Sequence, residues 1–264
     1  VMMGVPTYYV RLLQEDGLNA DVCAKLRVFI SGSAPLLTET FELWRERTGH
    51  TILERYGMSE TIMLTSNPYH GDPAQRRAGT VGLPLPEVSV RVMKDVKTGS
   101  AGTPCTTGEI GDIQVRGPNV FAGYWRMPEK TREEFTPDGW FKTGDVGRFD
   151  ADGYLSIVGR SKDLIITGGY NVYPKEIESY LDEMDGVAES AVIGVPHADF
   201  GEAVTAVVVP RPGAKLDGEA LIAALKAKIA NFKVPKRVFV VAELPRNTMG
   251  KVQKNVLRER FGGA

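Results

Sequence analysis

The stretch from residue 153 to residue 178 constrains the fold of this chain most. It combines a strand pattern, a charged turn, a second strand pattern, a loop with adjacent glycines and the start of a helix. Glycine-rich turns and short β segments precede it, whereas a small α/β pattern follows it. A charged joint between two such bodies is where a two-domain enzyme pivots. We therefore predict two domains, residues 1–161 and residues 162–264.

Composition sets the broad class of the protein. A chain of 264 residues is long enough for two domains. A net charge of −1 gives no basic surface for nucleic acid, and no apolar run is long enough to span a bilayer. The cysteines, Cys23 and Cys105, lie far apart and outside any CxxC motif, which favours a reducing cytoplasm. The first residues lack a signal-peptide pattern, and we expect the chain to be the C-terminal portion of a longer protein.

The first domain divides into two patterns. Strand, loop, helix and strand patterns over residues 26–54 are typical of a parallel α/β sheet, which we assign to residues 1–78. Ligands of such sheets bind beyond the carboxyl ends of the strands, where residues 31–35 and 56–60 lie. Alternating strands separated by glycine and proline turns predict a small antiparallel barrel over residues 79–161. The residues from Lys162 onwards predict a small, mobile α+β domain.

Several short motifs follow one another in an order that is typical of a known family. Residues 159–163 (Gly-Arg-Ser-Lys-Asp) and residues 168–171 (Gly-Gly-Tyr-Asn) resemble the hinge signature of the adenylate-forming superfamily. That superfamily comprises acyl-CoA synthetases, adenylation domains of peptide synthetases and luciferases. The resemblance implies a hinge at Lys162, and it implies ATP, Mg²⁺ and coenzyme A as ligands. The family's phosphate loop ending in Pro-Lys-Gly does not occur in these residues, and we expect it upstream.

Residues 56–60 match the family's Tyr-Gly-x-Ser-Glu motif. A magnesium nucleotide needs a hard oxygen ligand, which Glu60 can supply. The hydroxyl of Ser59 can donate to the α-phosphate, and the ring of Tyr56 can stack on adenine. The alternative is a surface turn with a solvated carboxylate.

Residues 31–36 resemble the family loop that lines both adenine and the acid pocket. Small residues there let the backbone approach a flat ring closely. An ordinary strand-to-helix turn could have the same sequence. By the resemblance, the nucleotide contacts Ser33, Ala34, Pro35, Glu54, Arg55, Tyr56, Gly57, Met58 and Ser59. The acid pocket is expected at Gly32, Ser33, Arg55 and Met58.

A second carboxylate occurs in the Thr-Gly-Asp sequence of residues 143–145. A carboxylate can accept from both hydroxyls of a ribose, and the resemblance gives this role to Asp145. Arg160 is expected as a second ribose or phosphate contact. The alternatives are a turn or cap role for Asp145 and a salt bridge from Arg160 to a neighbour such as Asp163.

Residues 245–254 resemble the family's C-terminal Gly-Lys motif. The resemblance makes Lys251 the cation that bridges the attacking carboxylate and the α-phosphate, whose like charges otherwise repel. Most exposed lysines have no such role, so the assignment depends on the other motifs. The resemblance also implies that a lysine acetyltransferase and a deacetylase could act on Lys251, because acetylation removes its charge.

The two glycines that follow the hinge have a predicted role in binding a thiol. By the resemblance, Gly168, Gly169 and Tyr170 line the passage of the pantetheine arm of coenzyme A once the small domain has rotated. Asn171 stands where relatives often carry Arg or Gln, which puts a direct phosphate contact there in doubt.

The sequences of these motifs most resemble those of malonyl-CoA synthetases, so a small carboxylic acid is the expected substrate. A dicarboxylate needs a cation for its distal charge, because an unpaired buried carboxylate costs roughly several kcal/mol. Arg55 is the candidate cation, and a pair with Glu54 is its structural alternative. Three other functions remain open: a ligase for another acid, an amino-acid adenylation domain and a non-catalytic AMP-binding module.

Overall fold

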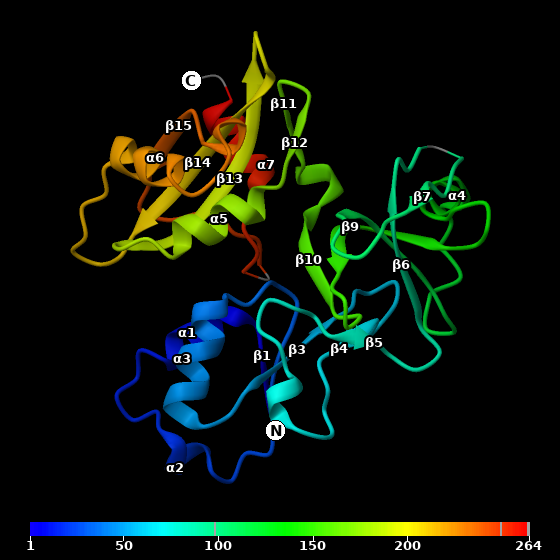
Figure 1. Ribbon diagram of the computed structural model, residues 1–264, viewed down its shortest axis with the longest axis horizontal. Helices are drawn as coiled ribbons and strands as arrows, with labels where there is room; N and C mark the ends of the chain where they lie inside the picture. Colours follow the sequence, from blue (N-terminus) through cyan, green and yellow to red (C-terminus); the bar gives the residue numbers. More distant parts are fainter. Residues whose placement is uncertain (98, 249, 263–264) are drawn as a thin grey trace. The chain divides into compact units, whose positions relative to one another are not determined.

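The computed structural model describes residues 1–97, 99–248 and 250–262 and divides the chain into two compact units (Figure 1). Unit 1 comprises Val1–Ile157 and unit 2 comprises Val158–Ala264. The division falls inside strand β10 (Leu155–Arg160), shortly before the predicted hinge at Lys162.

Unit 1 begins with a mixed sheet whose first three strands are parallel and whose last two are antiparallel to their neighbours. Its strands, in spatial and chain order, are β1 (Met2–Gly4), β2 (Phe29–Ser31), β3 (Ile52–Tyr56), β4 (Thr65–Ser66) and β5 (Leu83–Pro84). The connections contain helices α1 (Pro6–Leu12), α2 (Ala20–Cys23), α3 (Thr38–Thr48) and the short turn η1 (Pro73–Gln75). The parallel strands with helical connections confirm the predicted α/β arrangement.

Aromatic packing fixes α1 and α3 on the parallel strands. Trp44 of α3 is fully buried, and its ring meets those of Tyr9 and Phe29 edge-on at centroid distances of 4.9 and 5.0 Å. Such edge contacts add ~0.5–1.5 kcal/mol each beyond the burial of area. Helix α3 ends at Gly49, whose φ of 72° supplies a left-handed cap. The carboxyl ends of β2 and β3 therefore stand on a rigid base.

The second part of unit 1 is a five-stranded sheet in the order β10-β9-β8-β6-β7. Its other strands are β6 (Ser89–Lys94), β7 (Thr103–Pro104), β8 (Gly111–Arg116) and β9 (Phe141–Phe149), and helix α4 (Pro128–Glu134) precedes β9. β6 pairs antiparallel with β7 and β8, and β8 pairs antiparallel with β9. Residues 150–153, whose Asp-Ala-Asp-Gly sequence predicts a hairpin turn, form the turn between β9 and β10, since Oδ1 of Asp150 accepts from the N–H groups of Asp152 and Tyr154.

Unit 2 is an α+β fold around a single sheet in the order β12-β11-β14-β13, with β15 paired parallel to β14. Its elements are η2 (Ser161–Asp163), β11 (Ile165–Thr167), β12 (Tyr170–Val172), α5 (Pro174–Asp182), β13 (Val187–His197), β14 (Gly201–Pro210), α6 (Gly218–Lys226), η3 (Asn231–Lys233), β15 (Arg237–Val240) and α7 (Lys254–Phe261). This content agrees with the α+β pattern predicted from the sequence.

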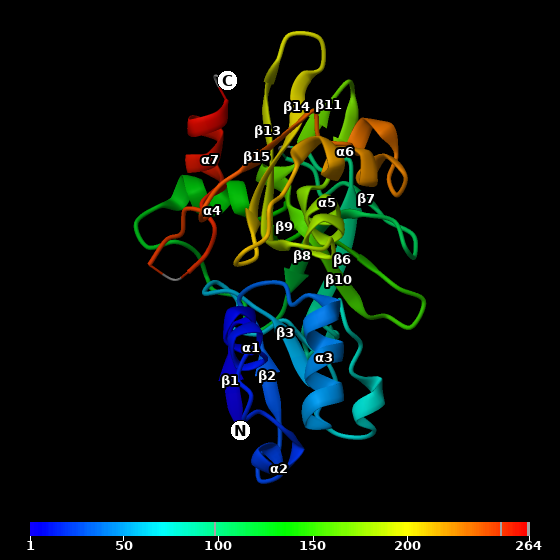
Figure 2. The ribbon, with the colours of Figure 1, turned by 90° about the vertical axis from the view of Figure 1, so that its left-hand side faces the viewer.

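Both faces of the unit 2 sheet are covered (Figure 2). Val192 and Val208 face the side on which α5 and α6 pack. Ile193 and Val207 face the opposite side, where Leu257 of α7 lies. Successive strand residues point to opposite faces, so two apolar faces produce the continuous apolar runs of β13 and β14.

Two details differ from the sequence-based expectation. The amphipathic pattern predicts a helix over residues 217–231, whereas helix α6 ends at Lys226, where the N–H groups of Lys228 and Ile229 both bond to the carbonyl of Leu225 and close a turn. Short strands such as β1 and β12 were not predicted, because they are too short to show a period.

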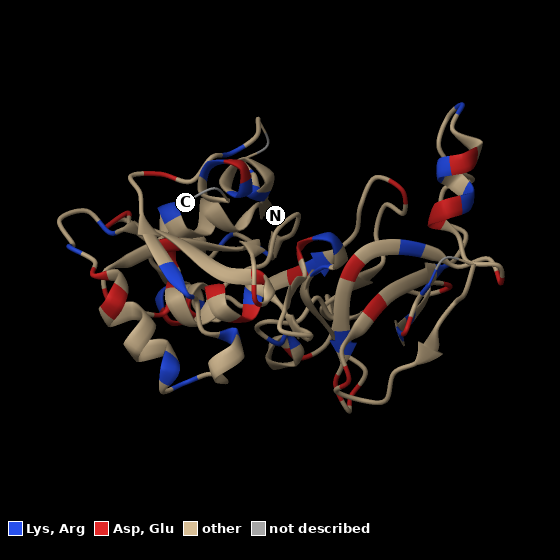
Figure 3. Cartoon of the chain, turned by 90° about the horizontal axis from the view of Figure 1, so that it is seen from above, with Lys and Arg blue, Asp and Glu red and all other residues tan. Residues whose placement is uncertain are grey.

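Charged residues of both signs are interspersed along the elements of both units (Figure 3). Several form local ion pairs, such as Arg91 with Asp138 at 2.7 Å and Lys233 with Glu176 at 2.7 Å. Among the described residues, no helix is both long enough and apolar enough to cross a membrane.

Candidate active site

The segments that follow β2 and β3 leave the parallel sheet side by side. Ser31 at the end of β2 pairs with Glu54 of β3 in the strand register. Gly32 lies directly against Arg55, since a Cβ atom at Gly32 would stand 3.4 Å from the carbonyl oxygen of Arg55. This edge is where parallel sheets bind their ligands, and two of the predicted motifs meet there.

The loop after β2 is exposed and has an uncommon backbone geometry. Ser33 has a φ of 69°, in the left-handed region that residues with a side chain rarely adopt. Ala34 and Pro35 follow it and are exposed as well. Strained backbone of this kind clusters at ligand-binding loops, where the surrounding structure maintains it. The contact of these residues with a nucleotide stays a prediction. The exposed, left-handed loop is compatible with it.

A buried hydrogen bond joins two of the predicted motifs across unit 1. The hydroxyl of Tyr56 at the end of β3 donates to Oδ2 of Asp145 in β9 at 2.5 Å, although the two residues are 89 positions apart. Both side chains are buried, with exposed fractions of 8% and 5%. A carboxylate has about four acceptor positions, so this bond is compatible with acceptance from a diol as well. The predicted adenine and ribose residues thus form one polar site.

Glu54 is a buried carboxyl group in β3, only 5% exposed. Its burial raises its pKa to about 8, and the backbone N–H groups of Leu36 and Gly79 offset part of this effect. Among the described residues, its Oε1 atom has no hydrogen-bond partner. The raised pKa favours the neutral form of Glu54 near pH 7, and the pair with Arg55, the alternative role of that arginine, does not occur as an ion pair between described residues.

Glu60 lies in the loop after β3, half-buried and hydrogen-bonded. Its Oε1 atom accepts from the hydroxyl of Tyr124 at 2.9 Å, and its backbone carbonyl accepts from the N–H of Phe121 at 2.8 Å. Burial, followed by the bond to Glu60, raises the pKa of Tyr124 to about 12, so the hydroxyl stays protonated and donates. Ser59, the predicted phosphate donor, is exposed next to it.

The donor set at Glu60 suits a metal ion that arrives with its nucleotide. No group of three or more His, Cys, Asp or Glu side chains among the described residues could hold a metal ion. Mg²⁺ commonly takes one or two protein carboxylates and completes its shell with substrate phosphates and water. A single carboxylate such as Glu60 fits a Mg²⁺ ion that a nucleotide brings with it.

Only some of the residues predicted for the acid pocket lie next to one another. Arg55 extends toward Met3, with its Nη2 atom 3.7 Å from the sulfur atom. Met58 is half-buried against the core cluster that contains Leu64 and Phe141. Arg55 and Gly32 lie together, whereas Met58 contributes to the core of the unit.

In unit 2, Lys251 lies on a tight hairpin. Its N–H donates to Oδ1 of Asn247 at 2.9 Å, its carbonyl accepts from the N–H of Asn247 at 2.9 Å, and its side chain is exposed. Gly250 has a φ of 78°, which the turn requires, and its carbonyl accepts from Nη1 of Arg246 at 2.8 Å. Met249, also in the Gly-Lys motif, lies outside the described residues. The hairpin presents Lys251 to solvent on a defined backbone.

The predicted hinge lies in a short helical turn. Lys162 is exposed in η2, and Arg160 is exposed at the end of β10. The neighbouring Asp163 accepts from Nη2 of Arg258 in α7 at 2.8 Å. The hinge role of Lys162 and the ribose contact of Arg160 stay predictions.

The two glycines after the hinge form the turn of the β11–β12 hairpin. Thr167 pairs with Tyr170, so Gly168 and Gly169 are the two turn residues, with φ values of 55° and 80°. The ring of Tyr170 stacks on that of Phe232 at a centroid distance of 4.5 Å and is 57% exposed. Small residues and an exposed aromatic pair are thus neighbours within unit 2.

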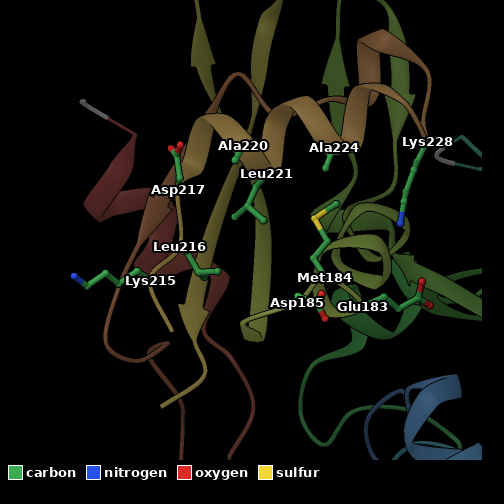
Figure 4. Close-up of a pocket in the computed structure, with 10 residues that line it drawn as sticks. All are labelled: Glu183, Met184, Asp185, Lys215, Leu216, Asp217, Ala220, Leu221, Ala224 and Lys228. Carbon is green, nitrogen blue, oxygen red and sulfur yellow. The ribbon is translucent and has the colours of Figure 1, made fainter. Parts of the chain in front are cut away.

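Unit 2 also contains a surface cavity. It has a volume of about 530 Å³ between the end of α5 and helix α6, where Met184, Leu216 and Leu221 lie among charged side chains such as Lys215 and Lys228 (Figure 4). Of the described residues, none that was predicted as a site residue lines this cavity.

Two contacts of the site were missed at the sequence level. Tyr124 was interpreted as part of a structural motif, whereas its hydroxyl bonds to Glu60. Phe232 carried no motif at all and stacks on Tyr170. The tyrosine beside a glycine in residues 123–125 was the available signal for the first contact, and no signal pointed to the second.

Glu54 makes a testable contribution to the pH dependence of stability. The pKa of Glu54 is raised from 4.5 to about 8 in the folded state. Its contribution to the free energy of unfolding is therefore fully present below about pH 4.5 and is lost as the pH rises through about 8, because the unfolded state ionises first. Glu54→Gln is expected to become more stable relative to the wild type across this window. Urea unfolding of both proteins at about pH 5, 7 and 9 measures the difference. Glu46→Gln, an exposed change on α3, is the control, and parallel pH profiles for Glu54→Gln and the wild type would refute the assignment.

Known proteins resemble this chain over nearly all its length. It is 42% identical to a malonate–CoA ligase of Arabidopsis thaliana, with 98% of this chain and 44% of that protein covered. It is 41% identical to the mitochondrial malonate–CoA ligase of Homo sapiens, with 99% and 50% covered. The chain thus spans about half the length of the curated relatives it matches.

A solved structure and two family models agree with these relatives. The crystal structure of ATP-bound MatB from Rhodopseudomonas palustris has a TM-score of 0.92 and 59% identity, covering 98% of this chain and 50% of that one. Residues 1–125 match the model of the AMP-binding enzymes, and residues 176–251 match that of the AMP-binding enzyme C-terminal domain. The two models together match well over half of the chain. The chain belongs to the AMP-binding, adenylate-forming enzymes.

Proposed function

We propose that the whole protein is an AMP-forming carboxylate–CoA ligase and that its acid is malonate. The observation that carries the proposal is the buried bond from Tyr56 to Asp145, which unites the predicted adenine and ribose residues beside Glu60. The likeness to two malonate–CoA ligases and to ATP-bound MatB supports the class and favours malonate. The cysteine usage favours the cytoplasm as its location.

The first half-reaction in this proposal makes an acyl-adenylate. A carboxylate oxygen of the acid attacks the α-phosphorus of ATP, the bond from that phosphorus to the bridging oxygen breaks, and pyrophosphate leaves. Asp145 and Arg160 hold the ribose, Ser33, Ala34, Pro35 and Tyr56 border the adenine, and Ser59 donates to the α-phosphate. Glu60 binds the Mg²⁺ of Mg-ATP, and Lys251 offsets the repulsion between the two anions.

The second half-reaction transfers the acyl group to coenzyme A. The sulfur attacks the acyl carbon, the thiol proton goes to solvent, the carbon–oxygen bond to the adenylate breaks, and AMP leaves. Rotation at Lys162 exchanges Lys251 for the turn of Gly168 and Gly169, beside which the pantetheine arm passes. The exposed stack of Tyr170 on Phe232 offers a flat apolar surface next to that turn.

Malonate brings a second carboxylate, which Arg55 would neutralise. Arg55 lies against Gly32 at the sheet edge, and its guanidinium contacts a thioether instead of a carboxylate. A cation without an ion-pair partner among the described residues is suited to an anionic group of a ligand. The preference for a dicarboxylic acid would then depend on this side chain.

The test of the function is ATP–pyrophosphate exchange by the full-length protein with malonate, methylmalonate, acetate, octanoate, coumarate and amino acids. Exchange with malonate is the expected result. Exchange with another acid would keep the chemistry and discard malonate, and exchange with an amino acid would favour an adenylation domain. Absence of exchange with every acid would favour a non-catalytic AMP-binding module.

The change Lys251→Ala separates the two half-reactions. It is expected to slow adenylate formation by about 10²-fold or more, because a charge that stabilises the transition state is lost. Thioester formation from preformed acyl-adenylate is expected to stay near the wild-type rate. Single-turnover assays of each step measure the split, with the exposed Lys215→Ala as control. Equal losses in both steps would contradict the assignment.

Acetylation of Lys251 by an acetyltransferase would remove the same charge, and a deacetylase would restore it.

The change Arg55→Gln tests the distal carboxylate. It is expected to lower kcat/KM for malonate by about tenfold to a hundredfold, since each tenfold is about 1.4 kcal/mol of lost interaction. Acetate lacks the second carboxylate, so kcat/KM for acetate is expected to change little. The exposed Arg45→Gln on α3 is the matched control. An equal loss for both acids would assign Arg55 to the nucleotide or to the fold instead.

A further inference from the structure

The loop that carries Glu60 is strained and is held by a segment from the second sheet. Ile62 has a φ of 56°, which is unfavourable for a β-branched residue, and its carbonyl oxygen would lie 1.9 Å from a Cβ atom at Gly57. Nδ2 of Asn119 donates to the carbonyls of Thr61 and Met63 at 2.8 and 2.9 Å. We call residues 119–124 the clamp segment, because they fix this loop from outside the parallel sheet.

The clamp segment reaches Glu60 through both backbone and side chain. The N–H of Phe121 donates to the backbone carbonyl of Glu60 at 2.8 Å, and the hydroxyl of Tyr124 donates to its Oε1 atom at 2.9 Å. Tyr124 is itself fixed, since its N–H donates to Oγ1 of Thr131 at 2.9 Å and its ring meets that of Phe121 edge-on at 4.8 Å. The direction of the Glu60 carboxylate is therefore determined by Tyr124.

A hydrogen bond to one carboxylate oxygen limits how the group can bind a cation. With Oε1 engaged by Tyr124, Glu60 offers a metal ion the other oxygen, Oε2, as a single ligand. Mg²⁺ requires a near-ideal octahedral shell at about 2.0–2.1 Å and suits single-oxygen carboxylates, whereas Ca²⁺ accepts six to eight ligands and both oxygens of one carboxylate. A carboxylate held in this way favours Mg²⁺.

We propose that Tyr124 is a positioning residue that makes Glu60 a one-oxygen ligand and thereby sets the preference of the site for Mg-ATP over Ca-ATP. The proposal rests on the function proposed above, in which Glu60 meets the metal ion of the nucleotide. Hydrogen-bond partners of metal ligands orient those ligands, and their loss typically weakens metal binding by about 10–100-fold.

Tyr124→Phe is the direct test, because it removes the hydroxyl and keeps the ring that packs on Phe121. Tyr154→Phe is the matched control: its hydroxyl also donates at 2.9 Å, but to the backbone carbonyl of Gln75. Calorimetric titration of the full-length proteins with ATP, in the presence of Mg²⁺ or Ca²⁺, gives the two affinities. Tyr124→Phe is expected to weaken Mg-ATP binding by about tenfold and to narrow the Mg²⁺-to-Ca²⁺ ratio of affinities. The ratio for Tyr154→Phe is expected to equal that of the wild type.

A purely structural role for Tyr124 predicts a different pattern. Loss of packing would lower the melting temperature and weaken both complexes equally, leaving the ratio of affinities unchanged, and this result would overturn the proposal. A double-mutant cycle with Glu60→Gln gives a second, independent readout. If Tyr124 acts through Glu60, Tyr124→Phe has no further effect on the ratio once Glu60→Gln is present, whereas an unchanged effect in that double variant would overturn the proposal.

The same titrations separate this proposal from the function on which it rests. A wild-type protein that binds ATP without any dependence on a divalent cation would refute the assignment of Glu60 to Mg-ATP, and the proposal would fail with it. A wild-type protein that prefers Mg-ATP, combined with a Tyr124→Phe protein of identical preference, would refute the role of Tyr124 alone.

Discussion

The buried hydrogen bond between Tyr56 and Asp145 is the contact on which the organisation of unit 1 depends. It joins the last residue of strand β3 in the mixed sheet to strand β9 of the antiparallel sheet. A carboxylate that is 5% exposed is costly unless it is hydrogen-bonded, so folding favours the arrangement in which the tyrosine reaches it. The two sheets of unit 1 can therefore not be treated as independent bodies, and the site at their meeting point is specified by the same bond.

The clamp segment likewise holds Glu60 by hydrogen bonds between distant segments of unit 1. Asn119, Phe121 and Tyr124 all belong to the connection after β8, yet they bond to the loop after β3. A loop with a left-handed isoleucine would relax without external partners, because such a conformation costs of the order of 1–3 kcal/mol. The strain is maintained by bonds from a distant segment, and the carboxylate consequently points in one direction.

The sequence was most informative where a pattern repeats or a backbone geometry demands a particular residue. The apolar runs of β13 and β14 and the Gly168–Gly169 turn could be predicted because burial on both faces and positive φ values each require distinct residue types. The order of motifs gave the family. The bond from Tyr124 to Glu60 could not be predicted, because it links segments 64 positions apart and a tyrosine in a strand-rich region reads as core. Short strands such as β4 gave no period at all.

Unit 2 carries the two turns of the proposed function on separate hairpins, and each turn is closed by its own bonds. The Gly168–Gly169 turn is closed by the pairing of Thr167 with Tyr170, and its first N–H donates to the carbonyl of Phe200. The Lys251 hairpin is closed by Asn247 and by the pairing of Arg246 with Val252. Among the described residues, no backbone hydrogen bond links the two turns, so in the proposed function a rotation of the whole unit could exchange them without remodelling either one. The proposed hinge at Lys162 would then need to change only the dihedral angles of η2, which is the least demanding form of conformational change between the two proposed half-reactions.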